Sequence, residues 1–197
     1  ESYKSLRKRL LKLPTAPKSA GSYDFVVVGG GVAGMCAAIA AARTGSRVAL
    51  IQDRSVLGGN NSSEIRVGLG GRLNIGLYPS LGYLLNEFAP VTKGNARTAD
   101  VYEDEKKLAA VLAEKRITLF MGYRVTDVGK KDNKITSVVA TDVMNHSRIR
   151  VSGRLFADCT GDANLGVLAG AEWSMGREAK SKYGEESAPE VADTMTM

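Results

Sequence analysis

Three glycines at a fixed spacing are the first residues of the chain that could do chemistry. Gly29, Gly31 and Gly34 follow the pattern Gly-x-Gly-x-x-Gly directly after an apolar run. In this pattern the first glycine makes a tight turn, the second lets the backbone approach a pyrophosphate, and the third lets a helix pack against a strand. The N–H groups that open such a helix, here near Val32 and Ala33, stabilise an anion without any lysine. The spacing therefore predicts a phosphate-binding turn for a dinucleotide.

A site of this type also needs an acceptor for the ribose hydroxyls at the end of the second strand, about 20 residues after the glycines. That place holds Gln52, with Asp53 beside it, where an acidic residue is usual. The Gln52 amide can accept one hydrogen bond and donate another, and Asp53 reaches the ribose if the strand ends one residue later. Arg54 raises a rival interpretation, in which an arginine binds the 2′-phosphate of NADP. We expect a ribose without that phosphate.

The glycine turn requires a strand before it and a helix after it, and the sequence predicts both. Residues 23–28 are apolar without alternation, which is typical of a parallel strand buried on both faces. Residues 31–44 are rich in alanine and stop at Gly45, as a helix commonly does, and residues 47–51 form a second apolar run. Together these segments make a βαβ unit.

The remaining patterns predict an α/β fold, a Rossmann-like doubly wound parallel sheet with an inserted three-stranded antiparallel β-meander. A glycine-rich stretch over residues 57–74 is expected to be a functional loop or a lid. Helices are expected at 78–88, 99–115 and 162–169, a third parallel strand at 116–120, the meander at 124–128, 134–143 and 148–152, and a return to the parallel sheet at 154–159.

Three segments together make the pattern more specific: VGGGVAG at 28–34, RSVLGGNNSSEIR at 54–66 and ADCTGDAN at 157–164. With them the chain resembles the FAD-dependent oxidoreductases that have a glutathione-reductase type of FAD-binding domain, and among these a bacterial group. The resemblance implies that Gly58 and Gly59 pass the pyrophosphate and the ribityl chain. It also implies that FAD is the cofactor.

Further positions acquire roles only from this resemblance. The residues it places around FAD are Asn60, Ser62 and Ser63 at the ribityl chain or flavin, the backbone of Val125 at the adenine edge, and Thr160, Gly161 and Asp162 close to the cofactor. Each also has a plainer interpretation as a loop or cap residue; Asp162, for example, could cap the helix that it precedes.

The function that follows is the FAD-binding portion of an oxidoreductase, with hydride transfer between a small-molecule substrate and FAD. Two alternatives stay open at this point, an NAD(P)-linked dehydrogenase and a non-catalytic binding module with a dinucleotide fold. Proteins of this type are longer, so we expect a fragment whose substrate region and catalytic residues lie outside the 197 residues. Glu64 and Arg66 either face the substrate or form an internal ion pair.

Other reactive side chains indicate little chemistry of their own. Cys36 and Cys159 lie apart in apolar segments, which favours core packing over a redox disulfide or a metal site, and fits a reducing compartment such as the cytoplasm without fixing it. His146 is the single histidine and lies at an expected hairpin tip, so a general base there is not expected. No apolar run is long enough to cross a bilayer.

The net charge of +6 is concentrated in one arm of the chain. Residues 1–20 contain six basic residues against one acidic residue, so the charge does not indicate a nucleic-acid partner for the domain. The arm has the spacing of an amphipathic helix ending before Pro14; it could dock on its own domain, touch a membrane or a partner, or belong to a processed leader. We expect an arm and linker at 1–22, the dinucleotide-binding domain at 23–177 and a polar segment at 178–197. The oligomeric state is left open.

Overall fold

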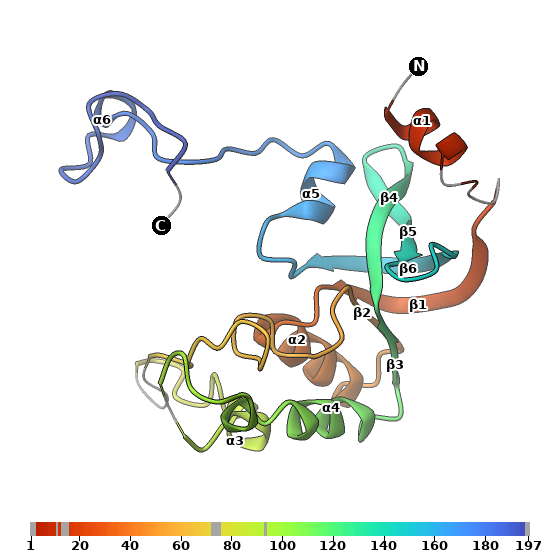
Figure 1. The fold of residues 1–197 in the computed structure, drawn as a ribbon, viewed down its shortest axis with the longest axis horizontal. Helices are drawn as coiled ribbons and strands as arrows, with labels where there is room; N and C mark the ends of the chain where they lie inside the picture. Colours follow the sequence, from red (N-terminus) through yellow and green to blue (C-terminus); the bar gives the residue numbers. More distant parts are fainter. Residues whose placement is uncertain (1–2, 11, 13–15, 72–75, 93, 196–197) are drawn as a thin grey trace.

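A single six-stranded sheet organises the chain in the computed structural model, which describes residues 3–10, 12, 16–71, 76–92 and 94–195 (Figure 1). The strand order is β3-β2-β1-β6-β5-β4. The strands are β1 (Lys18–Val28), β2 (Val48–Gln52), β3 (Ile117–Met121), β4 (Tyr123–Lys131), β5 (Lys134–Asp142) and β6 (Arg148–Asp158). β1 pairs in parallel with β2 and β6, and β2 with β3, whereas β4, β5 and β6 pair antiparallel. The expected α/β fold is confirmed.

Both faces of the parallel strands are covered, which explains their continuous apolar sequence. Val27, Val48 and Leu50 face one core cluster with α2 (Val32–Arg43), α3 (Leu85–Phe88) and α4 (Asp104–Leu112). The alternate residues Val26 and Ile51 face a second cluster with β4, β5, β6 and α5 (Asn164–Ala169). Figure 1 shows α2 and α4 on one side of the strands and α5 on the other.

The antiparallel meander is joined to the parallel sheet more closely than its sequence indicates. The segments expected as two strands, at 148–152 and 154–159, form the single strand β6. Its first half pairs with β5, and almost its whole length pairs with β1. β1 likewise begins at Lys18, inside the expected linker, and pairs Lys18 with Ile149. The alternation of apolar and polar residues and the turn residues between them mark strand segments. They do not show that one strand pairs in parallel with one neighbour and antiparallel with another.

Two expected helices are shorter in the structure. In the 78–88 segment only α3 is helical, because Gly82 adopts a left-handed φ of 96° and the residues before it form turns. The 99–115 segment divides into a 3-10 helix, η1 (Ala99–Tyr102), and α4, because Glu103 between them has a left-handed φ of 47°. This conformation is uncommon for a residue other than glycine, and residue patterns do not reveal it.

The two ends of the chain carry short helices. The expected amphipathic helix of the arm is present as α1 (Tyr3–Leu10), and Pro14 lies outside the described residues. The C-terminal segment contains α6 (Lys180–Tyr183) and closes on itself through a bridge between Arg177 and Asp193. In Figure 1 this segment extends away from the sheet. Among the described helices none is long and apolar enough to span a membrane.

Replacement of Ile39 tests how much the packing of α2 against the sheet stabilises the fold. Ile39 is 1% exposed within the first core cluster, so Ile39→Ala is expected to lower the free energy of unfolding by about 2–5 kcal/mol through lost burial and a cavity. Leu112→Ala, at a helix residue that is 63% exposed, is the matched control and should change it by less than about 0.5 kcal/mol. Denaturant unfolding measures both, and equal effects would contradict this packing.

Candidate cofactor site

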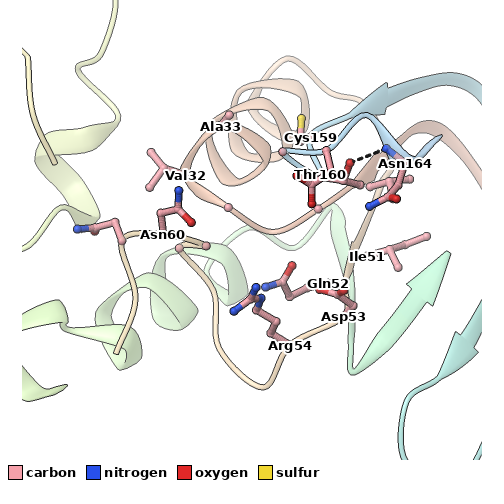
Figure 2. A pocket seen from close by; sticks show the side chains of 18 of the residues that line it. Val32, Ala33, Ile51, Gln52, Asp53, Arg54, Asn60, Cys159, Thr160 and Asn164 are labelled. Atoms are coloured by element: carbon pink, nitrogen blue, oxygen red, sulfur yellow. Dashed lines mark hydrogen bonds between the residues drawn. The ribbon is translucent and has the colours of Figure 1, made fainter. Parts of the chain in front are cut away.

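A cavity of about 530 Å³ lies at the carboxyl ends of β1, β2 and β6, where open α/β sheets bind their ligands (Figure 2). Three turns that are distant in the sequence line it, one after each of these strands, and the start of β4 closes one side. The sequence-predicted residues that line it are Gly29, Gly31, Val32, Ala33, Gln52, Asp53, Arg54, Gly58, Gly59, Asn60, Val125, Thr160, Gly161 and Asp162. Gly34, Ser62 and Ser63 do not.

The glycines of the first turn are required for different reasons. Gly29 has a φ of 103°, and a side chain there would meet the Cys159 carbonyl at 2.2 Å. A Cβ on Gly34 would lie 1.9 Å from the Gly29 oxygen, so this glycine allows α2 to pack against the turn, as its position in the motif predicts. Gly31 differs from both, because its φ of −66° suits any residue and the nearest atom to an added Cβ is 3.9 Å away. The fold therefore does not require glycine at position 31.

The second glycine pair lies directly against the first turn. Gly58 N–H donates to the Gly30 carbonyl at 2.9 Å, and Gly31 and Gly58 form a parallel bridge. A Cβ on Gly59 would come within 3.1 Å of the Gly31 Cα, and Gly59 has a left-handed φ of 61°, so position 59 favours glycine. The two motifs thus form one cradle of bare backbone, at the N-terminus of α2.

The side-chain amide of Gln52 is hydrogen-bonded at both ends. Its Oε1 accepts the Gly30 N–H at 2.8 Å and its Nε2 donates to the Val56 carbonyl at 2.8 Å. The side chain is 3% exposed, and both ends of the amide are engaged by backbone. Gln52 therefore joins the glycine turn to the loop after β2, and the nearest carboxylate in the chain that lines the cavity belongs to Asp53.

The charged residues at the rim form ion pairs. Asp53 lies 3.4 Å from Nε of Arg124, a residue at the start of β4 that the sequence did not single out. Arg54 lies 3.3 Å from Glu64, whose carboxylate also accepts the Ser55 hydroxyl at 2.7 Å. Glu64 therefore takes part in an internal ion pair. Arg54, the residue that raised the possibility of NADP, already has an anionic partner.

The serines after the second glycine pair do not line the cavity. Ser62 is fully buried and its hydroxyl donates to the Gly59 carbonyl at 2.7 Å. The Ser63 N–H donates to the Asp104 carboxylate. Asn61, between Asn60 and Ser62, lines the cavity instead, and no signal in the sequence distinguishes it from its neighbours. Its Nδ2 donates to the Val67 carbonyl at 3.0 Å.

The third motif is shaped by Asp158 at the end of β6. Its carboxylate accepts the Thr160 hydroxyl at 2.7 Å and the Gly166 N–H at 2.9 Å, and the Thr160 hydroxyl accepts the Asn164 N–H. These bonds occupy the start of α5, so the cap that Asp162 could have supplied is already provided. Asp162 lines the cavity, and no hydrogen-bond partner for its carboxylate is found among the described residues.

The two cysteines behave as packing residues. Both are free and both contact the first core cluster, and Cys159 also lines the cavity. Burial raises the pKa of each thiol, and the neighbouring Asp158 carboxylate adds to the rise at Cys159. Both side chains therefore stay protonated near neutral pH and are weak nucleophiles.

Asp158 is expected to make α5 sensitive to acid. Partial burial raises the pKa of Asp158, but hydrogen bonds from Thr160 and Gly166 outweigh it and hold the pKa below its ordinary value. Its stabilisation is therefore full above that value and is lost as the pH falls through the folded-state pKa. Asp158→Ala should cost about 1–2 kcal/mol of unfolding free energy at neutral pH, and this cost should shrink below about pH 4. Asp162→Ala is the control, and an Asp158→Ala cost that is constant with pH would contradict the assignment.

Known proteins share this fold, although no curated protein matches the sequence. The FAD-complexed glycerol-3-phosphate dehydrogenase of Bacillus halodurans is 16% identical, with a TM-score of 0.54 over 77% of this chain and 37% of its own. The E. coli quinol fumarate reductase is 17% identical, with a TM-score of 0.53 over 73% and 33%. THI4 of Thermovibrio ammonificans is 21% identical, with a TM-score of 0.53 over 96% and 79%.

The chain thus spans about a third of the dehydrogenase and of the fumarate reductase. Its sequence matches the FAD dependent oxidoreductase family over residues 24–197, which include the glycine turn, the second glycine pair and the turn after β6. The chain belongs to the FAD dependent oxidoreductase family.

Proposed function

We propose that the chain holds the ADP half of FAD in this cavity and is the FAD-binding part of an enzyme that transfers hydride between a small-molecule substrate and the flavin. The observation that carries the proposal is Gly31. Neither its φ nor its surroundings require glycine, and a side chain there would extend into the cavity beside Gly59. Folding does not require that position 31 lack a side chain. A pyrophosphate bound at the N-terminus of the helix would require it.

Residues that line the cavity can be assigned to the pyrophosphate and the ribose of FAD. The N–H groups at Val32 and Ala33 would bind the pyrophosphate from the first turn, with Gly58 and Gly59 on its other side. Asp53 would accept the ribose hydroxyls, because the Gln52 amide is engaged by Gly30 and Val56. The cavity is large enough for part of a dinucleotide.

The resemblance to FAD-dependent oxidoreductases supplies the remaining proposed contacts. The backbone of Val125, at the start of β4, would hold the adenine edge. The turn after β6 would approach the cofactor through Thr160, Gly161 and Asp162, and Asn60 would face the ribityl chain or the flavin. Ser62 and Ser63 would act on the cofactor indirectly, through the loop that they hold.

The bound flavin would supply hydride transfer, while the protein orients it and excludes water. This chain would contribute the cofactor cradle. The ion pair of Arg54 with Glu64 favours FAD over NADP, because it leaves the arginine less available for a 2′-phosphate.

Gly31→Val is the direct test of the cradle. The variant should fold as the unaltered chain does, but its side chain should exclude the pyrophosphate and lower the affinity for FAD by at least about a hundredfold. Flavin absorbance retained after gel filtration, together with the melting temperature, measures the two effects. Gly70→Val is the control, because Gly70 has open space around it and lies outside the cavity lining. Unchanged FAD uptake by Gly31→Val would refute the phosphate position.

Asp53→Ala tests the ribose contact. A hydrogen bond to a charged acceptor is lost, so the affinity for ADP should fall about tenfold, measured by calorimetry. The unaltered chain should prefer ADP over 2′-deoxy-ADP, and this preference should disappear in the variant. A preference that survives the loss of Asp53 would assign the ribose hydroxyl to another residue.

A further inference from the structure

Lys107 is a buried lysine directly behind the second glycine pair. It lies on α4 and is 0% exposed, although lysine is almost never fully buried. A Cβ placed on Gly58 would meet Lys107 Cδ at 2.9 Å and Cε at 3.0 Å. Since Gly58 lines the cavity, the lysine stem passes under the floor of the proposed pyrophosphate cradle.

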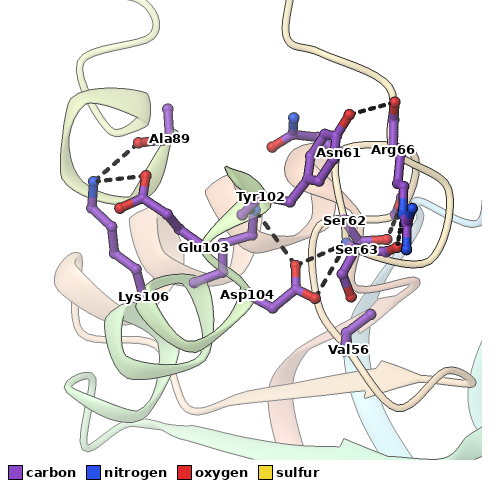
Figure 3. A network of polar contacts seen from close by, with 12 residues as sticks. Val56, Asn61, Ser62, Ser63, Arg66, Ala89, Tyr102, Glu103, Asp104 and Lys106 are labelled. Atoms are coloured by element: carbon purple, nitrogen blue, oxygen red, sulfur yellow. Dashed lines mark hydrogen bonds and ion pairs between the residues drawn. The ribbon is translucent and has the colours of Figure 1, made fainter. Parts of the chain in front are cut away.

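The ammonium group has few partners for a buried charge. Its Nζ donates to the Tyr102 carbonyl, and the nearest carboxylate oxygen, from Asp104, is 3.8 Å away. The same carboxylate accepts the Ser63 N–H with both oxygens at 3.2 Å, as Figure 3 shows. Asp104 therefore contacts both the lysine and the loop, and its carboxylate is not committed to Lys107 alone.

The cavity itself offers little free positive charge. Of the described residues that line it, only Arg54 and Arg124 are cationic, and they pair with Glu64 and Asp53. A pyrophosphate in the glycine cradle would carry about two negative charges into a site walled by backbone. Lys107 is a buried lysine whose stem lies against Gly58 in this wall, with its ammonium group next to the Tyr102 carbonyl.

We propose that Lys107 is a buried counter-ion for the pyrophosphate, which acts through the Gly58–Gly59 backbone and holds that loop in its binding position. The inference rests on the proposed function, because it needs a pyrophosphate in the cradle. Lys107 is a positioning residue, since the loop separates it from the ligand.

The charges around Lys107 predict that the affinity for ADP depends on pH. Burial lowers the pKa of Lys107, the carboxylates of Asp104 and Glu103 oppose this, and Lys106 adds to the lowering. A bound anion favours the protonated lysine, so ADP should bind more tightly below the Lys107 pKa than above it. The affinity for ADP should fall as the pH rises from about 7 to 10, whereas the affinity for adenosine should not.

Calorimetry with ADP and adenosine tests the proposal on the 197-residue chain. Lys107→Met should weaken ADP binding about tenfold or more, with adenosine unchanged within about twofold, because only ADP carries the pyrophosphate. Lys106→Met is the matched control, since the neighbouring Lys106 bonds the Ala89 carbonyl and points away from Ser63 (Figure 3). The double variant Asp104→Asn with Lys107→Met removes both charges, in case the single change prevents folding.

The outcomes separate the inference from the proposed function. An ADP-specific loss in either Lys107 variant, with a pH dependence that the variant lacks, supports the counter-ion. Equal loss for ADP and adenosine, or no loss, overturns it and leaves the proposed function standing. Absence of ADP binding by the unaltered chain overturns both. The pH profile of the unaltered chain needs no variant, and equal profiles for ADP and adenosine would also overturn the counter-ion.

Discussion

The backbone of Gly30 connects the parts of the cavity to one another. Its N–H donates to Gln52 at the end of β2, and its carbonyl accepts from Gly58 in the following loop. A Cβ on Gly30 would lie 2.6 Å from the end of the Leu57 side chain and 3.0 Å from the Gln52 Cβ, so a larger residue would have to displace these side chains. Because both bonds span adjacent parallel strands, the cradle depends on the register of β1 with β2.

This arrangement explains why a neutral amide suits position 52. A buried carboxylate could accept the Gly30 N–H, but it could not donate to the Val56 carbonyl, and its charge would be placed beside the proposed pyrophosphate. Gln52 satisfies both backbone groups without charge. The acidic group is displaced by one residue to Asp53, where solvent and Arg124 reduce the cost of its charge.

Side chains elsewhere hold the same cradle from outside. Tyr102 donates to the Arg66 carbonyl at 2.6 Å and Asp104 accepts the Ser63 N–H, so η1 and α4 fix both ends of the loop that follows Gly59. On the opposite side, Asp158 fixes the turn after β6 through Thr160. A loop rich in glycine is conformationally free, and these contacts restrict that freedom before any ligand binds.

The sequence by itself determined the βαβ unit and the residues that meet at its edge. Apolar runs without alternation require cover on both faces, and the glycine spacing places a helix N-terminus at the end of a strand, so both are local properties. Most of the expected cofactor residues, from Gly29 to Asp162, therefore line the cavity. Only the tertiary structure shows which bonds these residues make: Gln52 is engaged by backbone, and Ser62 and Ser63 hold the loop. It also places Lys107, which the sequence did not single out, behind that loop. Those roles depend on hydrogen bonds and burial between segments far apart in the chain, which residue type and spacing do not encode.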